Sequence, residues 1–343
     1  MLTTHLLRPE HVELEEAPVP KPQPGEALIH VKNVGICGSD IHAYYGKHPY
    51  IDLPIIQGHE FSGEIATLGS GVKGPPVGTR VTVVPMLHCR QCKNCRNGDY
   101  NRCAELKFIG CQTTGAMAEF VVVPEDKIIP LPDSIDDETG ALIEPLAVGL
   151  HGANIGKVCQ GSGVVIMGAG TIGLMTTLAV RALGASVILQ TDLEDSKLAV
   201  ASKLGADHTV NISNGSWQEA MQQAFGREGP DIMIECAGVP AAVQNAVKDA
   251  PRGCRIVLVG VYPEPQIPVN LGFVQDHELE LRGVAGYTIR EFRQAIDLVK
   301  AGKITVDNLK GIISARYPLK QAAEAYTFIE SSRASVLKVM LAV

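Results

Sequence analysis

The chain has 343 residues, of which 45% are hydrophobic and 20% charged, and its formal net charge is −7. These values are ordinary for globular proteins, and at roughly 150 residues per domain the length predicts about two domains. The acidic balance argues against nucleic acid or an anionic membrane as a partner, because proteins that bind them carry a basic excess. We find neither a membrane-spanning apolar run nor a signal-peptide pattern, so we expect a cytoplasmic protein.

The first 149 residues predict a compact, barrel-like β domain with few helices. Residues of high strand propensity gather in short segments that glycine and proline separate. The predicted strands cover residues 27–34, 64–68, 80–84 and 119–123.

After residue 149 strands alternate with helices, which predicts βαβ units and a doubly wound parallel sheet. The last part of the chain, with an amphipathic stretch over 289–300 and a strand over 336–341, does not continue this alternation. The predicted strands of the alternating part are 163–167, 186–191, 232–235 and 255–259, and its helices are 172–183 and 196–204.

Candidates for a catalytic metal site are dispersed through the first part of the chain: Cys37, His59, Glu60 and Glu144. Glu144 lies in an apolar run over 141–146, where a carboxylate needs a partner or a metal ion. A cysteine, a histidine and a carboxylate with room for water or substrate make up a catalytic zinc site. Taken alone, the His59–Glu60 pair is more often a buried histidine with satisfied hydrogen bonds than a metal ligand.

Four cysteines, Cys89, Cys92, Cys95 and Cys103, are crowded into one short segment. In a reducing compartment such a cluster favours metal binding over disulfides. Four thiolates complete a tetrahedral zinc site and leave no open position, so we expect this zinc to be structural. Unliganded thiols and an iron–sulfur cluster are the alternatives.

Gly168, Gly170 and Gly173 form a G-x-G-x-x-G motif between a predicted strand and a predicted helix. In this context the glycines allow a tight turn, the approach of a pyrophosphate and close helix packing. Asp192 ends the next strand, where a carboxylate binds ribose hydroxyls and repels a 2′-phosphate, so NAD is favoured over NADP. The alternative is a glycine-rich turn with a solvent-facing aspartate.

Together these motifs resemble the zinc-containing medium-chain dehydrogenase/reductase family over essentially the whole chain. The segment 58–63, followed by Gly69 and Val72, is similar to the family's zinc signature, and 140–148 looks most like the polyol branch. That branch contains sorbitol, galactitol-phosphate and butanediol dehydrogenases. The resemblance implies an α/β fold with a GroES-like β-rich catalytic domain from residues 1–149 and 286–343, which holds both zinc sites, and a Rossmann NAD-binding domain over 150–285.

The resemblance also implies roles for single residues. Cys37 and His59, with Glu144 or Glu60, would surround the catalytic zinc, and Asp40 would orient the zinc-bound histidine. Ser39 would contact the substrate oxygen and His42 would relay its proton outward. Beyond the glycines and Asp192, further contacts to NAD are expected from Thr171, Ile172, Lys197, Val259 and Val261.

The function expected from this resemblance is NAD-dependent oxidation of a secondary hydroxyl in a polyol or diol, with two zinc ions per chain, in a homodimer or homotetramer. L-Threonine or a sugar phosphate is the alternative substrate, and a non-catalytic zinc-binding relative is a further alternative. Sorbitol dehydrogenases carry an Arg-Tyr pair where this chain has Gly286-Tyr287, and the Asp-Pro-Phe motif of threonine dehydrogenases is absent.

Overall fold

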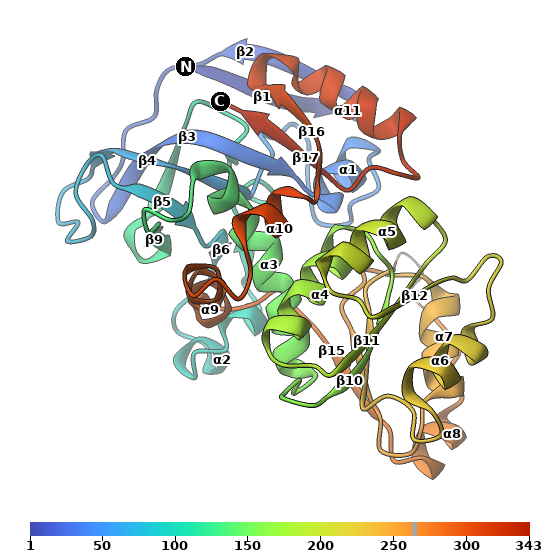
Figure 1. Ribbon diagram of the computed structural model, residues 1–343. Helices are drawn as coiled ribbons and strands as arrows, with labels where there is room; N and C mark the ends of the chain where they lie inside the picture. Colours follow the sequence, from blue (N-terminus) through green and yellow to red (C-terminus); the bar gives the residue numbers. More distant parts are fainter. Residues whose placement is uncertain (263–265) are drawn as a thin grey trace. The chain divides into compact units, whose positions relative to one another are not determined.

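A computed structural model describes residues 1–262 and 266–343 (Figure 1). The chain divides into two compact units, one formed by Met1–Glu144 with Ile313–Val343 and the other by Pro145–Ile312. The sequence placed its domain boundaries at 149/150 and 285/286. Residues 286–312, which the sequence assigned to the first domain, instead form part of the second compact unit. Within that unit Glu291 lies 3.3 Å from His151.

The first unit is built on a seven-stranded sheet in which β17 (Lys338–Ala342) and β4 (Glu60–Leu68) flank β3 (Glu26–Ile36) and run antiparallel to it. Phe61 and Ile65 of β4 are completely buried in its core. The path through the sheet is β16 (Ile313–Pro318), β17 (Lys338–Ala342), β3 (Glu26–Ile36), β4 (Glu60–Leu68), β5 (Arg80–Val83) and β9 (Ile128–Pro130), with β8 (Phe120–Pro124) paired to β3. Two-stranded ribbons are formed by β1 (Leu2–Arg8) with β2 (His11–Glu16) and by β6 (Met86–Leu87) with β7 (Lys107–Phe108).

Helices of the first unit are short, apart from α3 (Asp137–Ile155), in which the division between the units falls. The C-terminal helix packs against β2, β16 and β17, and its Tyr326 stacks on Tyr44 with ring centroids 4.7 Å apart. The helices are α1 (Gly38–Tyr44), α2 (Lys93–Arg96) and α11 (Ala322–Ser331), with 3₁₀ turns η1 (Tyr100–Arg102), η2 (Glu125–Lys127) and η3 (Leu319–Gln321).

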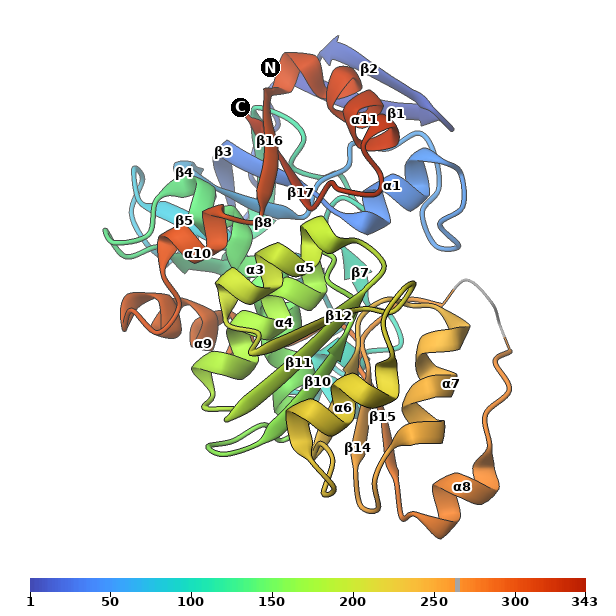
Figure 2. The ribbon, with the colours of Figure 1, turned by 45° about the vertical axis from the view of Figure 1, so that its right-hand side comes forward.

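The second unit contains a six-stranded sheet whose neighbouring strands all run parallel. Figures 1 and 2 show α4 and α5 along one face of this sheet and α6 and α7 along the other. The strand order is β12 (His208–Asn211), β11 (Val187–Asp192), β10 (Gly163–Met167), β13 (Ile232–Glu235), β14 (Arg255–Leu258) and β15 (Glu280–Gly283). The helices are α4 (Thr171–Ala182), α5 (Asp195–Leu204), α6 (Trp217–Phe225), α7 (Pro240–Asp249), α8 (Leu271–Asp276), α9 (Ile289–Lys300) and α10 (Val306–Lys310).

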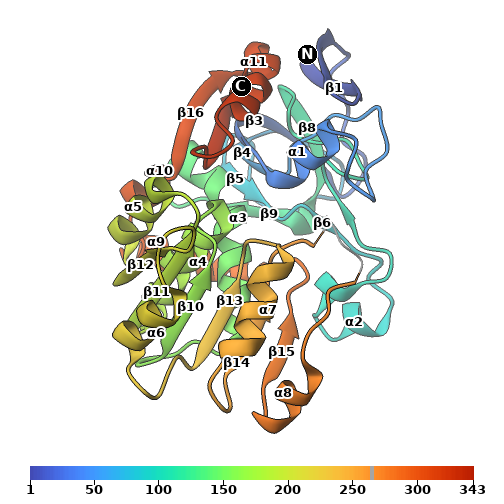
Figure 3. The same cartoon turned by 90° about the vertical axis from the view of Figure 1, so that its right-hand side faces the viewer.

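The predicted α/β class, a β-rich part and a doubly wound parallel sheet, is confirmed. In Figure 3 the second half of that sheet, β13 to β15, faces the viewer with α7 in front of it. Among the described residues no helix is long and apolar enough to cross a membrane.

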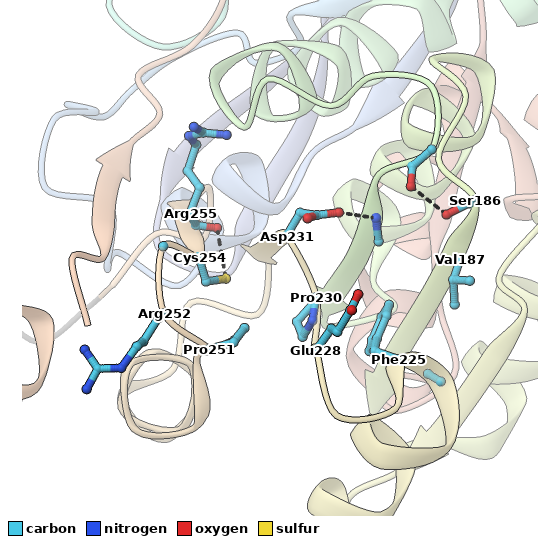
Figure 4. Close-up of a pocket in the computed structure, with 15 residues that line it drawn as sticks. Ser186, Val187, Phe225, Glu228, Pro230, Asp231, Pro251, Arg252, Cys254 and Arg255 are labelled. Atoms are coloured by element: carbon cyan, nitrogen blue, oxygen red, sulfur yellow. Dashed lines mark hydrogen bonds between the residues drawn. The ribbon is translucent and has the colours of Figure 1, made fainter. Parts of the chain in front are cut away.

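The amino ends of the parallel strands surround a polar pocket of about 490 Å³ (Figure 4). Asp231 accepts a hydrogen bond from the Gly163 backbone N–H at 2.7 Å, and Arg255 is paired with Glu280 at 2.9 Å. These charges fasten the strand ends to each other. The glycine motif and Asp192 lie at the opposite, carboxyl ends, where parallel sheets bind nucleotides.

Candidate functional site

Cys37, His59 and Glu60 come together where two antiparallel strands meet. Cys37 follows β3 and caps the amino end of α1, while His59 and Glu60 stand at the start of β4. Strand pairing sets Gly35 opposite Glu60. One ligand atom from each of Cys37, His59 and Glu60 lies within 4.8 Å of the other two, with His59 and Glu60 buried.

Glu60 is held by a lysine from the far end of the chain. Both partners are buried, and the Lys338 ammonium donates to the two Glu60 oxygens at 2.8 and 2.6 Å and to the Ile36 carbonyl at 3.0 Å. Burial by itself lowers the pKa of Lys338, but Glu60 and Cys37 outweigh it and raise that pKa. Gly35 makes room for the pair, because a Cβ there would lie 2.3 Å from Glu60 Oε2.

The donor set suits a zinc ion. Sulfur, imidazole nitrogen and carboxylate oxygen are the groups that zinc selects, and three of them leave a position for water or substrate. Asp40 Oδ1 is buried, forms no hydrogen bond with any residue that the structure describes, and lies 3.9 Å from His59 Nδ1, where a carboxylate orients a metal-binding histidine. Burial lowers the pKa of His59, but the charges of Cys37 and Asp40 raise it well above its usual value, so a metal ion would displace a proton there.

The other predicted catalytic residues are spread around this group. Ser39 lies on α1 and lines a cavity together with His59. His42, in the last turn of α1, is exposed and is not among the residues described as lining that cavity. Glu144 is buried on α3 and acts electrostatically on Lys338, but among the described residues only Cys37, His59 and Glu60 form the close ligand group.

The cavity beside His59 measures about 730 Å³, within the range of small-molecule sites. All of its lining residues belong to the first unit. They are Ser39, His48, Tyr50, His59, Ala104, Glu105, Leu106, Lys107, Phe108, Cys111 and Gln112.

Two residues that line this cavity, His48 and Cys111, belong to no motif recognised in the sequence. Cys111 Sγ lies 4.0 Å from His59 Nδ1, and burial raises the pKa of this thiol. His48 Nδ1 accepts a hydrogen bond from the Tyr50 backbone N–H at 3.3 Å. Burial, reinforced by His42 and His59, lowers the pKa of His48, so the neutral ring carries its proton on Nε2 and offers it as a donor.

The second predicted metal site is a compact cluster of four sulfurs. The Sγ atoms of Cys89, Cys92, Cys95 and Cys103 lie within 4.8 Å of one another, with Cys92–Cys95 at 3.4 Å and Cys89–Cys95 at 3.8 Å. A zinc–sulfur bond of ~2.3 Å gives tetrahedral edges of about 3.8 Å. The cluster therefore fits a closed zinc site.

A buried lysine stands beside this cluster. Lys127 Nζ lies 3.0 Å from His88 Nδ1 and 4.9 Å from the centre of the Tyr100 ring. Burial lowers the pKa of Lys127. Arg90 and Arg102, which adjoin the cluster in the sequence, are exposed and paired with Asp126 and Asp99.

Replacing Cys103 by serine is expected to remove one zinc ion per chain and to lower the melting temperature by about 5–10 °C, because the segment around it has little core of its own. The rate of the chemical step should change less. Differential scanning calorimetry and metal analysis measure the two effects. Cys159→Ser is the matched control, since Cys159 is exposed in the second unit. An unchanged melting temperature with full zinc content would contradict a structural zinc.

The dinucleotide motif adopts the geometry its glycines permit. Gly168 has φ +101°, and a Cβ on Gly173 would lie 2.1 Å from the Gly168 carbonyl oxygen. Gly170 caps the amino end of α4, and the amino end of a helix suits a pyrophosphate. Asp192 ends β11 and accepts hydrogen bonds from Ala169 N–H at 2.6 Å and from the loop that follows it.

Thr171 and Ile172 begin α4 and are half-buried, and Lys197 lies in the first turn of α5. Val259 follows β14, and Val261 is 84% exposed. Their contacts to NAD stay a prediction.

Asp192→Asn is expected to lower the preference for NAD over NADP by about tenfold or more, because the charge that repels a 2′-phosphate is lost. The amide oxygen can still accept from the backbone, so the fold should survive. The ratio of kcat/KM values for the two cofactors measures this effect. An unchanged ratio in a folded variant would show that Asp192 only fastens the loop.

Two protein-family models match parts of the chain. Residues 23–133 match the alcohol dehydrogenase GroES-like domain and residues 171–301 match the zinc-binding dehydrogenase model. The chain is 36% identical to a sorbitol dehydrogenase of Bacillus subtilis (strain 168), over 96% of this chain and 94% of that protein.

Two solved structures have the same fold as this chain. Galactitol-1-phosphate dehydrogenase from Escherichia coli superimposes with a TM-score of 0.93 at 32% identity and full coverage of both chains. An alcohol dehydrogenase from E. coli CFT073, solved with NADH, has a TM-score of 0.93 at 29% identity, covering 100% of this chain and 99% of that one.

The fold and the two metal-binding groups define a zinc-binding oxidoreductase that acts on CH–OH groups with a nicotinamide dinucleotide. The chain belongs to the zinc-binding dehydrogenase family with an alcohol dehydrogenase GroES-like domain.

Proposed function

We propose that this protein oxidises a secondary hydroxyl of a polyol or diol to a ketone and transfers the hydride to NAD. The observation that carries the proposal is the group of Cys37, His59 and Glu60 at the wall of a cavity that Ser39 also lines. Asp192 at the end of β11 supports NAD as the cofactor. All nine cysteines are free, which is consistent with a reducing, cytoplasmic location.

The protein's own groups have separate tasks in this reaction. Cys37, His59 and a carboxylate would hold a zinc ion, which would supply polarisation of the alcohol oxygen and so lower its pKa. Ser39 receives the hydroxyl proton, and His42 passes it to solvent. Lys338 fixes Glu60, while Glu144 is the second carboxylate available to the site.

We expect the cavity of the first unit to select the substrate. His48 Nε2–H offers a donor to a second hydroxyl, and Glu105 and Lys107 add exposed charges to the lining. Gly286, in place of the arginine of sorbitol dehydrogenases, has φ +53°, a conformation that favours glycine. We therefore expect a diol or a polyol other than sorbitol.

Steady-state rates with a panel of diols, hexitols, a hexitol phosphate and L-threonine, each with NAD and NADP, test this function. A diol or polyol with NAD should give the highest kcat/KM. If L-threonine or the phosphate ester leads the panel, that alternative substrate class is correct. An enzyme inactive on the whole panel would contradict the proposal.

His42→Ala is expected to slow alcohol oxidation by about tenfold to a hundredfold at neutral pH, because a relay that solvent can replace contributes less than a directly acting base. Imidazole or a higher pH should restore part of the rate, and zinc content should not change. Steady-state kinetics and metal analysis decide between the roles. A normal pH–rate profile would leave His42 as a surface residue, whereas zinc loss would make it a ligand.

A further inference from the structure

A buried carboxylate joins the two loops that follow β13 and β14. Glu235 is the last residue of β13 and is completely buried. Its Oε1 accepts hydrogen bonds from the backbone N–H groups of Ala237 at 2.7 Å and Gly238 at 2.8 Å. Its Oε2 accepts one from the Tyr262 hydroxyl at 2.6 Å. One side chain thus fastens residues 236–238 to the segment after β14.

The backbones of these two loops lie in close contact with each other. The N–H groups of Val259 and Gly260 donate to the Glu235 carbonyl at 2.8 and 3.0 Å. A Cβ on Gly260 would lie 2.3 Å from the Gly238 nitrogen. Ala237 in turn presses on the glycine motif, since a Cβ on Gly168 would lie 3.1 Å from its nitrogen. The carboxylate therefore holds the loop after β13 to the segment after β14, and the first of these also lies against the glycine motif.

These loops stand where a dinucleotide is expected to cross the sheet. The strand order changes direction at β10, which has β11 on one side and β13 on the other. In such sheets the dinucleotide lies over this point, at the carboxyl ends of the strands. Asp192 assigns the adenosine half to the β11 side, which leaves the nicotinamide half to the loops after β13 and β14.

Two aliphatic side chains of these loops are exposed, Val239 at 47% and Val261 at 84%. Exposed aliphatic side chains beside a ligand site can pack against the face of a flat ring when the ligand binds. Burial raises the pKa of Glu235, and burial together with Glu235 raises the pKa of Tyr262, so the tyrosine keeps its proton and acts as the donor.

We propose that Glu235 and Tyr262 are positioning residues that hold Val239 and Val261 against the nicotinamide ring of the bound cofactor. The inference rests on the proposed use of NAD. It assigns the two residues to one half of the cofactor, so a ligand without nicotinamide separates this role from general stabilisation of the fold.

Calorimetric titration of Tyr262→Phe with NADH and with ADP-ribose, which lacks the nicotinamide, tests this role. We expect NADH to bind about five- to tenfold more weakly and ADP-ribose to change by less than about twofold, because only one buried hydrogen bond is lost. Val261→Ser should give the same pattern, and Glu235→Gln, which keeps the side chain's shape, should give a smaller loss. Trp217→Phe is the matched control, since it removes the 2.8 Å bond to Asp249 elsewhere in this unit and should change neither affinity.

An equal weakening of both ligands in Tyr262→Phe, or an unchanged NADH affinity, would overturn the positioning role. Thermal unfolding identifies a variant that fails to fold, and Val261→Ser, altered at an exposed side chain, then decides. If the unaltered protein binds neither ADP-ribose nor NADH, the proposed cofactor is wrong and the positioning role falls with it.

Discussion

Replacement of Cys37 by serine is expected to lower kcat by about 10³-fold or more, because metal polarisation of a substrate oxygen supplies several kcal/mol. Cys37 is the sulfur of the group that also contains His59 and Glu60, within 4.8 Å of one another. Without it the remaining donors hold zinc weakly. Metal analysis should show a loss of one zinc ion per chain, and steady-state kinetics should show the loss of turnover.

Cys111→Ser is the matched control for zinc content. Cys111 is buried and its sulfur lies 4.0 Å from His59 Nδ1, but it is not part of the described ligand group. This variant should keep both zinc ions. If it loses one while Cys37→Ser keeps both, the sulfur ligand has been assigned to the wrong cysteine.

Replacement of Lys338 by methionine should reduce the free energy of unfolding by about 3–5 kcal/mol, the range observed when one partner of a buried ion pair is removed. The Glu60 carboxylate would then stay completely buried without the ammonium that now contacts both of its oxygens. Urea denaturation of the zinc-loaded protein measures this loss.

The double variant Lys338→Met/Glu60→Gln should recover much of that stability, because the uncompensated charge is gone. Zinc content of the three proteins shows whether Glu60 also serves the metal. A single Lys338 variant within about 1 kcal/mol of the original protein would mean that the pair contributes little.

Features encoded by short spacing could be predicted from the sequence. The four cysteines of residues 89–103 share one segment, so their spacing alone indicates a common metal ion. Gly168, Gly170 and Gly173 sit between a strand and a helix that the hydrophobic pattern already predicts. The strands β10 and β13 have the predicted bounds, because the sequence of a buried parallel strand is an apolar run between turn residues.

Contacts between distant segments could not be predicted in the same way. Lys338 reaches Glu60 because β17 pairs with β3 and β3 with β4, a register that no local pattern specifies. A single lysine within a C-terminal strand is typical of an ordinary solvated charge. Glu235 was equally hidden, since a carboxylate that ends a strand gives no indication that it will turn back to bind its own loop.

Motif resemblance therefore identified the candidate ligands Cys37, His59 and Glu60, whereas three-dimensional pairing was needed to find Lys338 beside them. His42 illustrates the difference, because the family position predicts a proton relay, whereas the structure describes an exposed residue at the end of α1. His48 lines the cavity but belongs to a loop without a recognisable motif.

We propose that zinc held by residues of the first unit and NAD bound to the second both serve hydride transfer from a polyol or diol. Oxidation of the best panel substrate, deuterated at the reacting carbon, with mass analysis of the reduced cofactor, tests this claim most directly. The zinc-loaded protein should transfer the deuterium to the nicotinamide ring, the chelator-stripped protein should not, and added zinc should restore the transfer. Reduced cofactor without deuterium, or equal transfer with and without zinc, would contradict zinc-dependent hydride transfer to NAD.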